Sequence, residues 1–283
     1  MAERTLRITI YDLRCAIYDL RKVEIMDLGI KNRLFIVTGA TSGLGNGCAR
    51  ALLNDGANII VVARDNNKLD QFYNEYPDQI TTLCGDITKS VTIMQLMELV
   101  GHKYLDGLLI NAGGPPAKSF LETDLLDWDA AYDTILRWKV EITKAFLPKF
   151  ESQKYGRIVY IESQSVKQPI ENLVLSNSLR LAVVGFVKTL SQEIADKGIT
   201  LNIMAPGFHD TAAAHRLYVK RSEVEGITID QAKHKYESEI KVGRMGDVLE
   251  FGTLGAWLLS PLSGYITGQT ISVDGGAVKG TMG

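Results

Sequence analysis

The chain carries the glycine-rich stretch Thr38-Gly39-Ala40-Thr41-Ser42-Gly43-Leu44-Gly45 between two segments of different character. The apolar run at residues 34–38 has the length and composition of a buried strand, and residues 46–54 are typical of the start of a helix. Gly39 permits a tight turn, while Gly43 and Gly45 allow close approach of the backbone. Because unpaired N–H groups at a helix N-terminus attract anions, this order predicts a phosphate-binding loop rather than a simple structural turn.

Beyond this loop, short apolar runs alternate with longer segments of helical periodicity, which indicates repeated βα units and a parallel sheet. Seven parallel strands with crossover helices on both faces form a doubly wound, Rossmann-like α/β sheet, which is the fold class that we predict. The predicted strands cover residues 34–38, 58–63, 80–84, 107–111, 156–162, 200–205 and 270–273.

Two segments do not fit this alternation. In residues 1–25 a five-residue segment, Ile10 to Arg14, recurs once as Ile17 to Arg21, which is too few copies for a repeat fold. We therefore expect an N-terminal extension outside a single domain at residues 26–283, with initiation at Met26 as a hypothesis. The polar segment 207–243 lies between the sixth and seventh strands, where ligands bind in such sheets, so we interpret it as a lid; the alternative is a solvated helical excursion.

The composition excludes several classes of protein. Of 283 residues, 46% are hydrophobic and 23% are charged, and the net charge is −2, so the chain is neither disordered nor a protein that coats nucleic acid. Cys15, Cys48 and Cys84 are too few and too widely spaced for a disulfide framework or a metal site. No apolar stretch reaches the roughly 18–20 residues of a membrane helix. We expect a cytoplasmic protein that binds no metal, membrane or nucleic acid.

The glycine spacing, with three residues between the first two glycines and one before the third, resembles that of the short-chain dehydrogenase/reductase family. Further motifs follow later strands, and the resemblance covers about Asp27 to Ala277. Asp86 matches the residue that contacts adenine, Asn111-Ala112-Gly113 matches the turn after the fourth strand, and Pro206-Gly207 with Thr211 matches the loop on the nicotinamide side. The resemblance implies a dinucleotide site made of Gly39, Thr41, Ser42, Gly43, Leu44, Gly45, Arg64, Asp86, Ile87, Asn111, Ala112, Gly113, Arg180, Pro206, Gly207 and Thr211.

The end of the second strand bears on the choice of cofactor. Ala63 stands where an acidic residue would hold the ribose 2′-hydroxyl of NAD(H). Arg64 follows it and offers a planar fork of donors suited to a 2′-phosphate. We therefore expect NADP(H) to be favoured over NAD(H); the alternative is that Arg64 is a surface cation or stacks on adenine.

The catalytic positions of the resembled family are altered here. In that family a tyrosine exchanges the proton, a lysine four residues later lowers the pKa of that tyrosine and holds the ribose, a serine polarises the carbonyl group, and an asparagine supports a proton relay. Ser163 matches the serine, but Ser176, Arg180 and Ile135 stand at the other three positions. The one Tyr-x-x-x-Lys of the chain, at residues 18–22, precedes the first strand and does not replace the pair.

These replacements differ in their chemical consequences. An aliphatic hydroxyl is a far weaker acid than a phenol, so Ser176 is a poor proton donor. Arg180 does not release a proton, yet its donors still suit ribose hydroxyls. Other candidates for the acid each have an ordinary structural alternative as a surface or core-edge residue: Glu162, Lys167, Glu171 and His209.

Three functions stay open on these residues. The first is an NADP(H)-dependent oxidoreductase, similar to 3-oxoacyl reductases, which acts on a carbonyl or hydroxyl group of a small molecule. Ser163 would polarise the oxygen, and a group other than tyrosine, or water, would supply the proton. The second is a noncatalytic nucleotide-binding protein, and the third is a lyase or isomerase on the same scaffold. The resemblance also implies a homodimer or homotetramer packed through the helices after the fourth and fifth strands.

Overall fold

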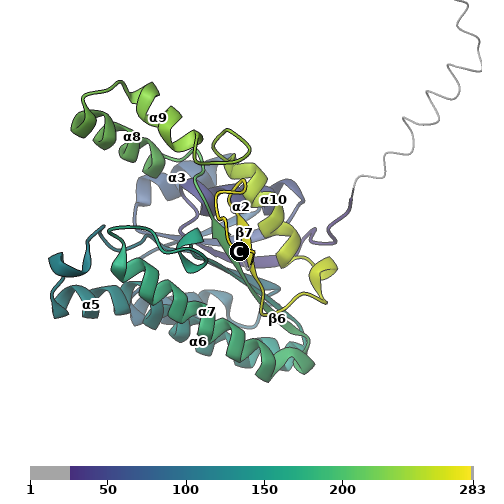
Figure 1. Ribbon diagram of the computed structural model, residues 1–283. Coiled ribbons are helices and arrows are strands. Elements are labelled where there is room, and N and C mark those ends of the chain that lie inside the picture. Colours follow the sequence, from purple (N-terminus) through teal and green to yellow (C-terminus); the bar gives the residue numbers. More distant parts are fainter. Residues whose placement is uncertain (1–25, 282–283) are drawn as a thin grey trace, which may run out of the picture.

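The computed structural model describes residues 26–281, apart from the side chains of Ala213 and Lys220, and has a parallel sheet at its centre (Figure 1). The strands pair in parallel in the order β3-β2-β1-β4-β5-β6-β7. The predicted doubly wound sheet of seven strands is therefore confirmed. The strands are β1 (Leu34–Thr38), β2 (Asn58–Ala63), β3 (Ile80–Cys84), β4 (Gly107–Ile110), β5 (Gly156–Ile161), β6 (Ile199–Pro206) and β7 (Thr270–Val273).

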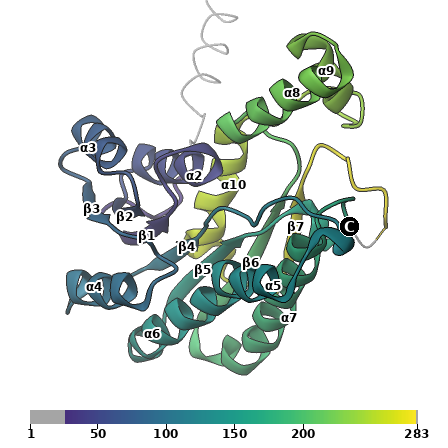
Figure 2. The ribbon, with the colours of Figure 1, turned by 90° about the vertical axis from the view of Figure 1, so that its left-hand side faces the viewer.

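Helices cover both faces of the sheet, with one apolar core on each face. Because successive strand residues point to opposite faces, Ile36 of β1 belongs to one core and Val37 to the other. Figures 1 and 2 show α2, α3 and α10 on one side of the sheet and α6 and α7 on the other. The helices are α2 (Gly43–Asn54), α3 (Asn66–Glu75) and α10 (Val248–Leu259), and opposite them α4 (Ser90–Val100), α6 (Trp138–Gln153) and α7 (Val174–Ile194).

Helices α2 and α10 are in backbone contact. A Cβ atom added to Gly47 of α2 would lie 2.1 Å from the carbonyl oxygen of Val248, and one added to Gly252 of α10 would lie 2.2 Å from that of Gly47. Only glycine allows this approach. This contact fixes the position of α2, the helix that follows the glycine-rich loop.

Short elements connect the strands to these helices. A 3₁₀ turn, η1 (Phe120–Glu122), and helix α5 (Leu125–Ala131) follow β4. A π-helical segment, η2 (Tyr132–Arg137), then joins α5 to α6, and such segments often occur at functional sites. Three further 3₁₀ turns are η3 (Gln164–Val166), η4 (Ala195–Lys197) and η5 (Pro261–Ser263).

The predicted insert at residues 207–243 contains two helices, α8 (Ala212–Glu225) and α9 (Ile229–Glu237). They project beyond the helices that cover the sheet (Figures 1 and 2). They have a small apolar core of their own, which includes Ala214, Tyr218 and Ala232. The side chain of Thr211 caps α8 by accepting a hydrogen bond from Ala214 N at 3.2 Å.

The structure corrects the boundaries of three strands. Strands β4 and β5 each end one residue earlier than predicted, at Ile110 and Ile161, while β6 extends one residue further at both ends. The predicted extension at residues 1–25 and its Tyr-x-x-x-Lys motif lie outside the described residues. None of the described helices combines the length and apolar content that a membrane span requires.

Candidate active site

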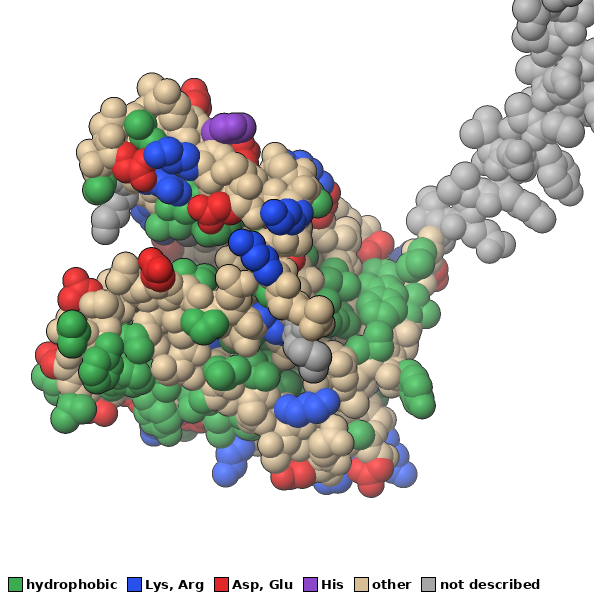
Figure 3. Space-filling model, viewed as in Figure 1, with side chains coloured by type: hydrophobic (Ala, Val, Ile, Leu, Met, Phe, Trp, Pro, Cys, Tyr) green, Lys and Arg blue, Asp and Glu red, His purple; other side chains and the backbone are tan. Residues whose placement is uncertain are grey.

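A cavity of about 1080 Å³ opens beyond the carboxyl ends of the strands. It exceeds the roughly 300–1,000 Å³ of most small-molecule pockets, as a dinucleotide and a substrate together require. Figure 3 shows the surface hollowed between the α8–α9 pair and the segment that contains α5. Of the predicted site residues, the wall includes Gly39, Thr41, Ser42, Gly43, Leu44, Arg64, Asp86, Ile87, Asn111, Ala112, Gly113, Gly207 and Thr211.

The glycine-rich loop places the N-terminus of α2 at this wall. Gly39 and Gly43 adopt positive φ angles of 63° and 57°, which L-residues other than glycine rarely adopt. Gly45 is not among the described residues that line the cavity. A Cβ on Gly45 would lie 2.3 Å from Gly39 O, so the glycine lets α2 start against the loop. The side chain of Ser42, which precedes α2, makes no capping hydrogen bond. The first N–H groups of α2 are therefore suited to a phosphate.

The turn after β4 is tied to the same loop by Thr38. Its hydroxyl donates to Asn111 O at 2.7 Å and accepts from Asn111 N at 2.8 Å. The side-chain amide of Asn111 lies so close to Gly39 that a Cβ there would be 2.9 Å from its nitrogen. The predicted Asn-Ala-Gly turn and phosphate-binding loop thus form one rigid corner of the cavity.

Charged residues after β2 and β3 line the opposite part of the wall. Asp86 accepts hydrogen bonds from Thr88 N at 3.0 Å and Thr88 Oγ1 at 2.8 Å. Partial burial raises the pKa of Asp86, but these bonds and the charges of Arg64 and Lys89 hold it below its ordinary value. Asp86 is therefore an ionised acceptor at neutral pH, close to the Arg64 cation.

Sequence reasoning missed two residues beside Arg64. Asp65 and Lys68 also line the cavity. Asp65 caps α3 by accepting from Lys68 N at 3.2 Å, and its carboxylate lies 3.9 Å from the Lys68 ammonium. The Asp-x-x-Lys spacing at a helix start is a signal that could have identified the pair. The negative charge of Asp65 is thus partly balanced where a 2′-phosphate is expected.

The structure brings Ser176 and Arg180 together on α7, where Arg180 Nε donates to Ser176 Oγ at 3.1 Å. Ser163 follows β5, and its hydroxyl accepts from Ser165 N at 3.1 Å. The described residues of the cavity wall do not include Ser163, Ser176, Arg180 or Pro206. Arg180 comes close to the wall, because a Cβ on the lining residue Gly114 would be 3.1 Å from Arg180 Nη2.

Two buried polar atoms follow Ser163. Among the described residues, Gln164 Oε1 and Ser165 Oγ have no hydrogen-bond partner. Buried polar groups normally have a partner, so these two atoms are available to a further hydrogen bond. Sequence reasoning did not single out these residues.

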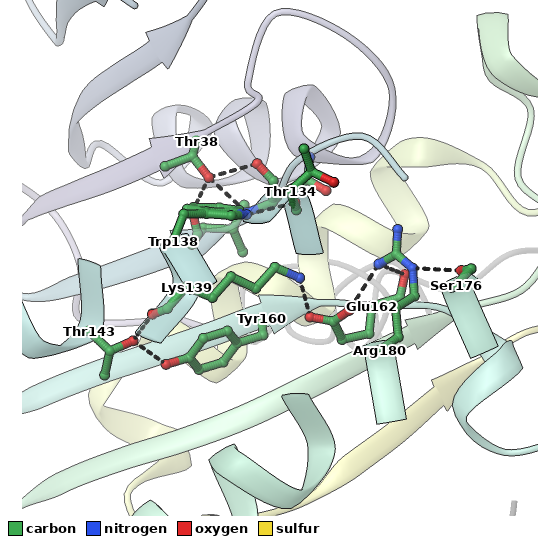
Figure 4. Close-up of polar contacts among 11 residues, drawn as sticks. Thr38, Thr134, Trp138, Lys139, Thr143, Tyr160, Glu162, Ser176 and Arg180 are labelled. Carbon is green, nitrogen blue, oxygen red and sulfur yellow. Dashed lines mark hydrogen bonds and ion pairs between the residues drawn. The ribbon is translucent and has the colours of Figure 1, made fainter. Parts of the chain in front are cut away.

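Glu162 belongs to a buried ionic cluster with Lys139 and Arg180 (Figure 4). Arg180 Nη1 donates to Glu162 Oε2 at 2.9 Å and to Glu162 O at 3.1 Å, and the Lys139 ammonium donates to Glu162 Oε1. The Glu162 side chain is 0% exposed and that of Lys139 is 3% exposed. Burial lowers the pKa of Lys139 most, Glu162 raises it and Arg180 lowers it, and the net direction is downward.

The other predicted acids are placed differently. His209 lines the cavity, yet it is buried, with Nδ1 3.1 Å from Gly207 O and its ring edge against Phe251. Burial lowers the pKa of His209, so this side chain is neutral at pH 7. Lys167 is half-buried and Glu171 is exposed, and neither is among the described residues that line the cavity. Ile135, at the family's asparagine position, is packed in the core.

Comparisons with known proteins agree with this arrangement. A family model described as enoyl-(acyl carrier protein) reductase matches residues 39–278. The 3-oxoacyl-[acyl-carrier-protein] reductase FabG of Aquifex aeolicus is 28% identical over 258 residues, which are 89% of this chain and 99% of that protein. Dehydrogenase/reductase SDR family member 6 of Rattus norvegicus is 29% identical over 249 residues, covering 87% and 98% of the two chains.

One solved structure combines similar sequence and fold. A variant of actinorhodin polyketide ketoreductase, solved with NADPH, is 28% identical, with a TM-score of 0.82. The match covers 88% of this chain and 98% of that one. The similarity therefore extends over the whole sheet and its helices.

Proposed function

Because the chain belongs to the short-chain dehydrogenase/reductase family, we propose that it is an NADP(H)-dependent oxidoreductase acting on a carbonyl or hydroxyl group of a small molecule. One observation carries the proposal: the cavity joins the start of α2, Arg64, Asp86 and the Asn111 turn in one wall. Its size suits a dinucleotide with a substrate beside it. The names of the relatives, a 3-oxoacyl reductase and a ketoreductase solved with NADPH, agree with this chemistry.

Each part of the wall has a separate task in cofactor binding. The N–H groups at the start of α2 bind the pyrophosphate, Arg64 binds the 2′-phosphate, and Asp86 accepts a hydrogen bond from adenine. Arg180, which lies behind the lining residue Gly114, donates to ribose hydroxyls with its Nη2 group. The bound cofactor supplies the hydride. Ala212, Arg216 and Leu217 of α8 line the cavity, which supports a role for the 207–243 segment as a lid.

The hydroxyl groups of Ser163 and Ser176 are the side-chain groups that would interact with the reacting oxygen. Reduction of a carbonyl group requires a hydride for its carbon, which the cofactor would supply, and a proton for its oxygen. Ser163 polarises this oxygen by donating a hydrogen bond, and Ser176 or a water molecule supplies the proton. Since a serine hydroxyl is a weak acid, we expect proton transfer to be slower than with a phenol.

A second candidate function is noncatalytic nucleotide binding. It is favoured by one observation, the presence of Ile135, Ser176 and Arg180 where the family has asparagine, tyrosine and lysine. This function needs the cofactor wall but not Ser163.

The two functions are separated by turnover with variants of Ser163. Oxidation of NADPH is followed with acetoacetyl-coenzyme A, a 3-oxoacyl thioester, and with a panel of simple ketones. Ser163→Ala is expected to lower kcat by about 10²–10³ and to leave NADPH binding intact, because it removes a donor to the developing oxyanion. Ser178→Ala, an exposed position on α7, is the control. NADPH binding without turnover on the whole panel would instead favour noncatalytic binding.

A further inference from the structure

The ionic cluster of Lys139, Glu162 and Arg180 joins two helices to one strand end. Lys139 lies on α6, Glu162 directly follows β5, and Arg180 lies on α7. Figure 4 shows Lys139, Glu162, Arg180 and Ser176 in one continuous line of polar contacts. All of these side chains are buried. Such a cluster is costly to bury, and its charges are paired with one another.

The charges of the cluster do not cancel. Burial lowers the pKa of Lys139, but its ion pair with Glu162 favours the protonated form. With Lys139 protonated, Arg180 and Lys139 each contribute one positive charge and Glu162 contributes one negative charge. Glu162 and Arg180 together have a net charge of zero, and Lys139 brings the net charge of the cluster to plus one. A buried charge acts over a longer range than an exposed one, because less water screens it.

The cluster lies directly behind the wall of the cavity. Arg180 Nη2 approaches Gly114, and Leu175, which precedes Ser176, lines the cavity. On the α6 side, Ala131 and Thr134 line the cavity one to two turns before Lys139. The helical segments that carry the cluster thus also supply part of the cavity wall.

We propose that Lys139 is a positioning residue, which holds Glu162 and thereby Arg180, and which leaves this end of the cavity with one net positive charge that disfavours the oxidised cofactor. The inference rests on the proposed function. The nicotinamide ring of NADP⁺ carries a positive charge and that of NADPH does not, so the cluster repels the oxidised ring and leaves the reduced ring unaffected. The protein therefore binds the reduced cofactor preferentially and favours reduction of its substrate.

The test is the ratio of the Kd for NADP⁺ to the Kd for NADPH, measured by titration without substrate. Lys139→Met replaces the lysine with an uncharged, unbranched side chain one atom shorter and leaves Glu162 paired with Arg180, so the net charge falls to zero. We expect the ratio to fall about tenfold, because removal of one buried unit charge acts on the charged ring of NADP⁺ and not on the neutral ring of NADPH. Lys144→Met, an exposed position on α6, is the matched control and leaves the ratio unchanged.

A charge-balanced double variant separates charge from packing. Lys139→Met combined with Glu162→Gln removes one charge of each sign and is expected to restore both the net charge and the wild-type ratio. Glu162→Gln alone removes the group that raises the pKa of Lys139, so it serves only as a folding control. Thermal unfolding establishes that each variant is folded, and if Glu162→Gln alone does not fold, the double variant still gives the comparison. A purely structural role of Lys139 would weaken both cofactors equally and leave the ratio constant, which would overturn the inference.

The outcomes also separate this inference from the proposed function. If the wild-type protein binds both cofactors but Lys139→Met does not change the ratio, the charge inference is wrong and the proposed function stands. If the wild-type protein binds neither cofactor, both are wrong.

Discussion

Arg64 supplies a positive charge to the cavity wall directly after β2, close enough to Asp86 to lower the pKa of that carboxyl group. No acidic side chain occupies the last position of β2, which is Ala63. The residue types at this strand end therefore favour a phosphate over a free hydroxyl group at the 2′ position of the adenosine ribose.

Replacement of Arg64 tests the choice between the two cofactors. Arg64→Ala is expected to raise the Kd for NADPH about 10- to 100-fold, because it removes charge-assisted hydrogen bonds worth about 1.5–3 kcal/mol. The Kd for NADH should stay nearly constant. Lys103→Ala, an exposed position away from this cavity, is the control in the same fluorescence titration. An equal loss for NADH and NADPH would argue against a 2′-phosphate contact.

His209 predicts a pH dependence of stability. Burial holds the pKa of His209 below its ordinary value of about 6.5, so below that pH the unfolded chain binds a proton that the folded chain does not. The free energy of unfolding is therefore constant above about pH 6.5 and falls as the pH drops towards the lowered pKa. Denaturant unfolding between pH 5 and 8 measures this loss.

His209→Gln should reduce the fall in the free energy of unfolding at acid pH, whatever its effect on stability at pH 8. His102→Gln replaces an exposed histidine after α4 and should leave the profile as in the wild type. A profile that is the same in all three proteins would contradict the assignment to His209.

The cofactor residues were predictable from the sequence because each follows a strand at a fixed spacing, and the strand ends meet at one edge of the sheet. The ionic cluster of Lys139, Glu162 and Arg180 was not predictable from the sequence. The sequence marks Glu162 only as a candidate acid and does not single out Lys139, since a lysine on a helix normally faces solvent. Only the fold brings α6 and the end of β5 together.

The packing of α2 against α10 is the element-scale feature that holds the phosphate-binding loop. Gly47 and Gly252 allow the two helix backbones to touch. Helix α2 begins at Gly43, so any separation of the helices displaces the N–H groups at its start.

A methyl group at this contact should destabilise the protein. Gly252→Ala is expected to lower the free energy of unfolding by about 1–3 kcal/mol, because the added Cβ would overlap the Gly47 carbonyl. Gly185→Ala, on the exposed side of α7 with no atom within 4 Å, is the matched control and should stabilise by about 0.5–1 kcal/mol. Chemical denaturation checks both, and equal effects would show that the helices do not need the glycine contact.

All seven strands could be located from the sequence, most of them because both faces of the sheet are covered, which makes the strands continuous apolar runs. The contact between α2 and α10 could not be predicted, since it joins segments far apart in the chain and depends on backbone approach. The separate core of α8 and α9 was also missed. Its aromatic residues, including Tyr218 and Tyr236, are spread through a polar segment.

At the scale of the molecule, apolar side chains stay exposed on the helices after β4 and β5. Leu125 and Leu126 of α5 and Leu181 of α7 are 83%, 75% and 53% exposed. Burial on the sheet explains other apolar residues of α7, such as Leu175 and Val183. The exposed residues agree with the homodimer or homotetramer that the family resemblance implies.

A charge on this face should dissociate the assembly. Leu181→Lys is expected to convert an oligomer into monomers in sedimentation velocity, because it places an ammonium group in an apolar contact. Met94→Lys, at an equally prominent apolar position on α4, is the control and should not change the oligomeric state. A wild-type protein that sediments as a monomer would contradict the prediction.

Binding of NADPH and NADH to the purified wild-type protein tests the central claim most directly, since it requires no knowledge of the substrate. Energy transfer from Trp128, Trp138 and Trp257 to the reduced nicotinamide reports on binding of either cofactor. An NADP(H)-dependent oxidoreductase is expected to bind NADPH at micromolar concentration and NADH clearly more weakly. Absence of binding for both cofactors would show that the cavity serves another ligand, and the proposed function would then be wrong.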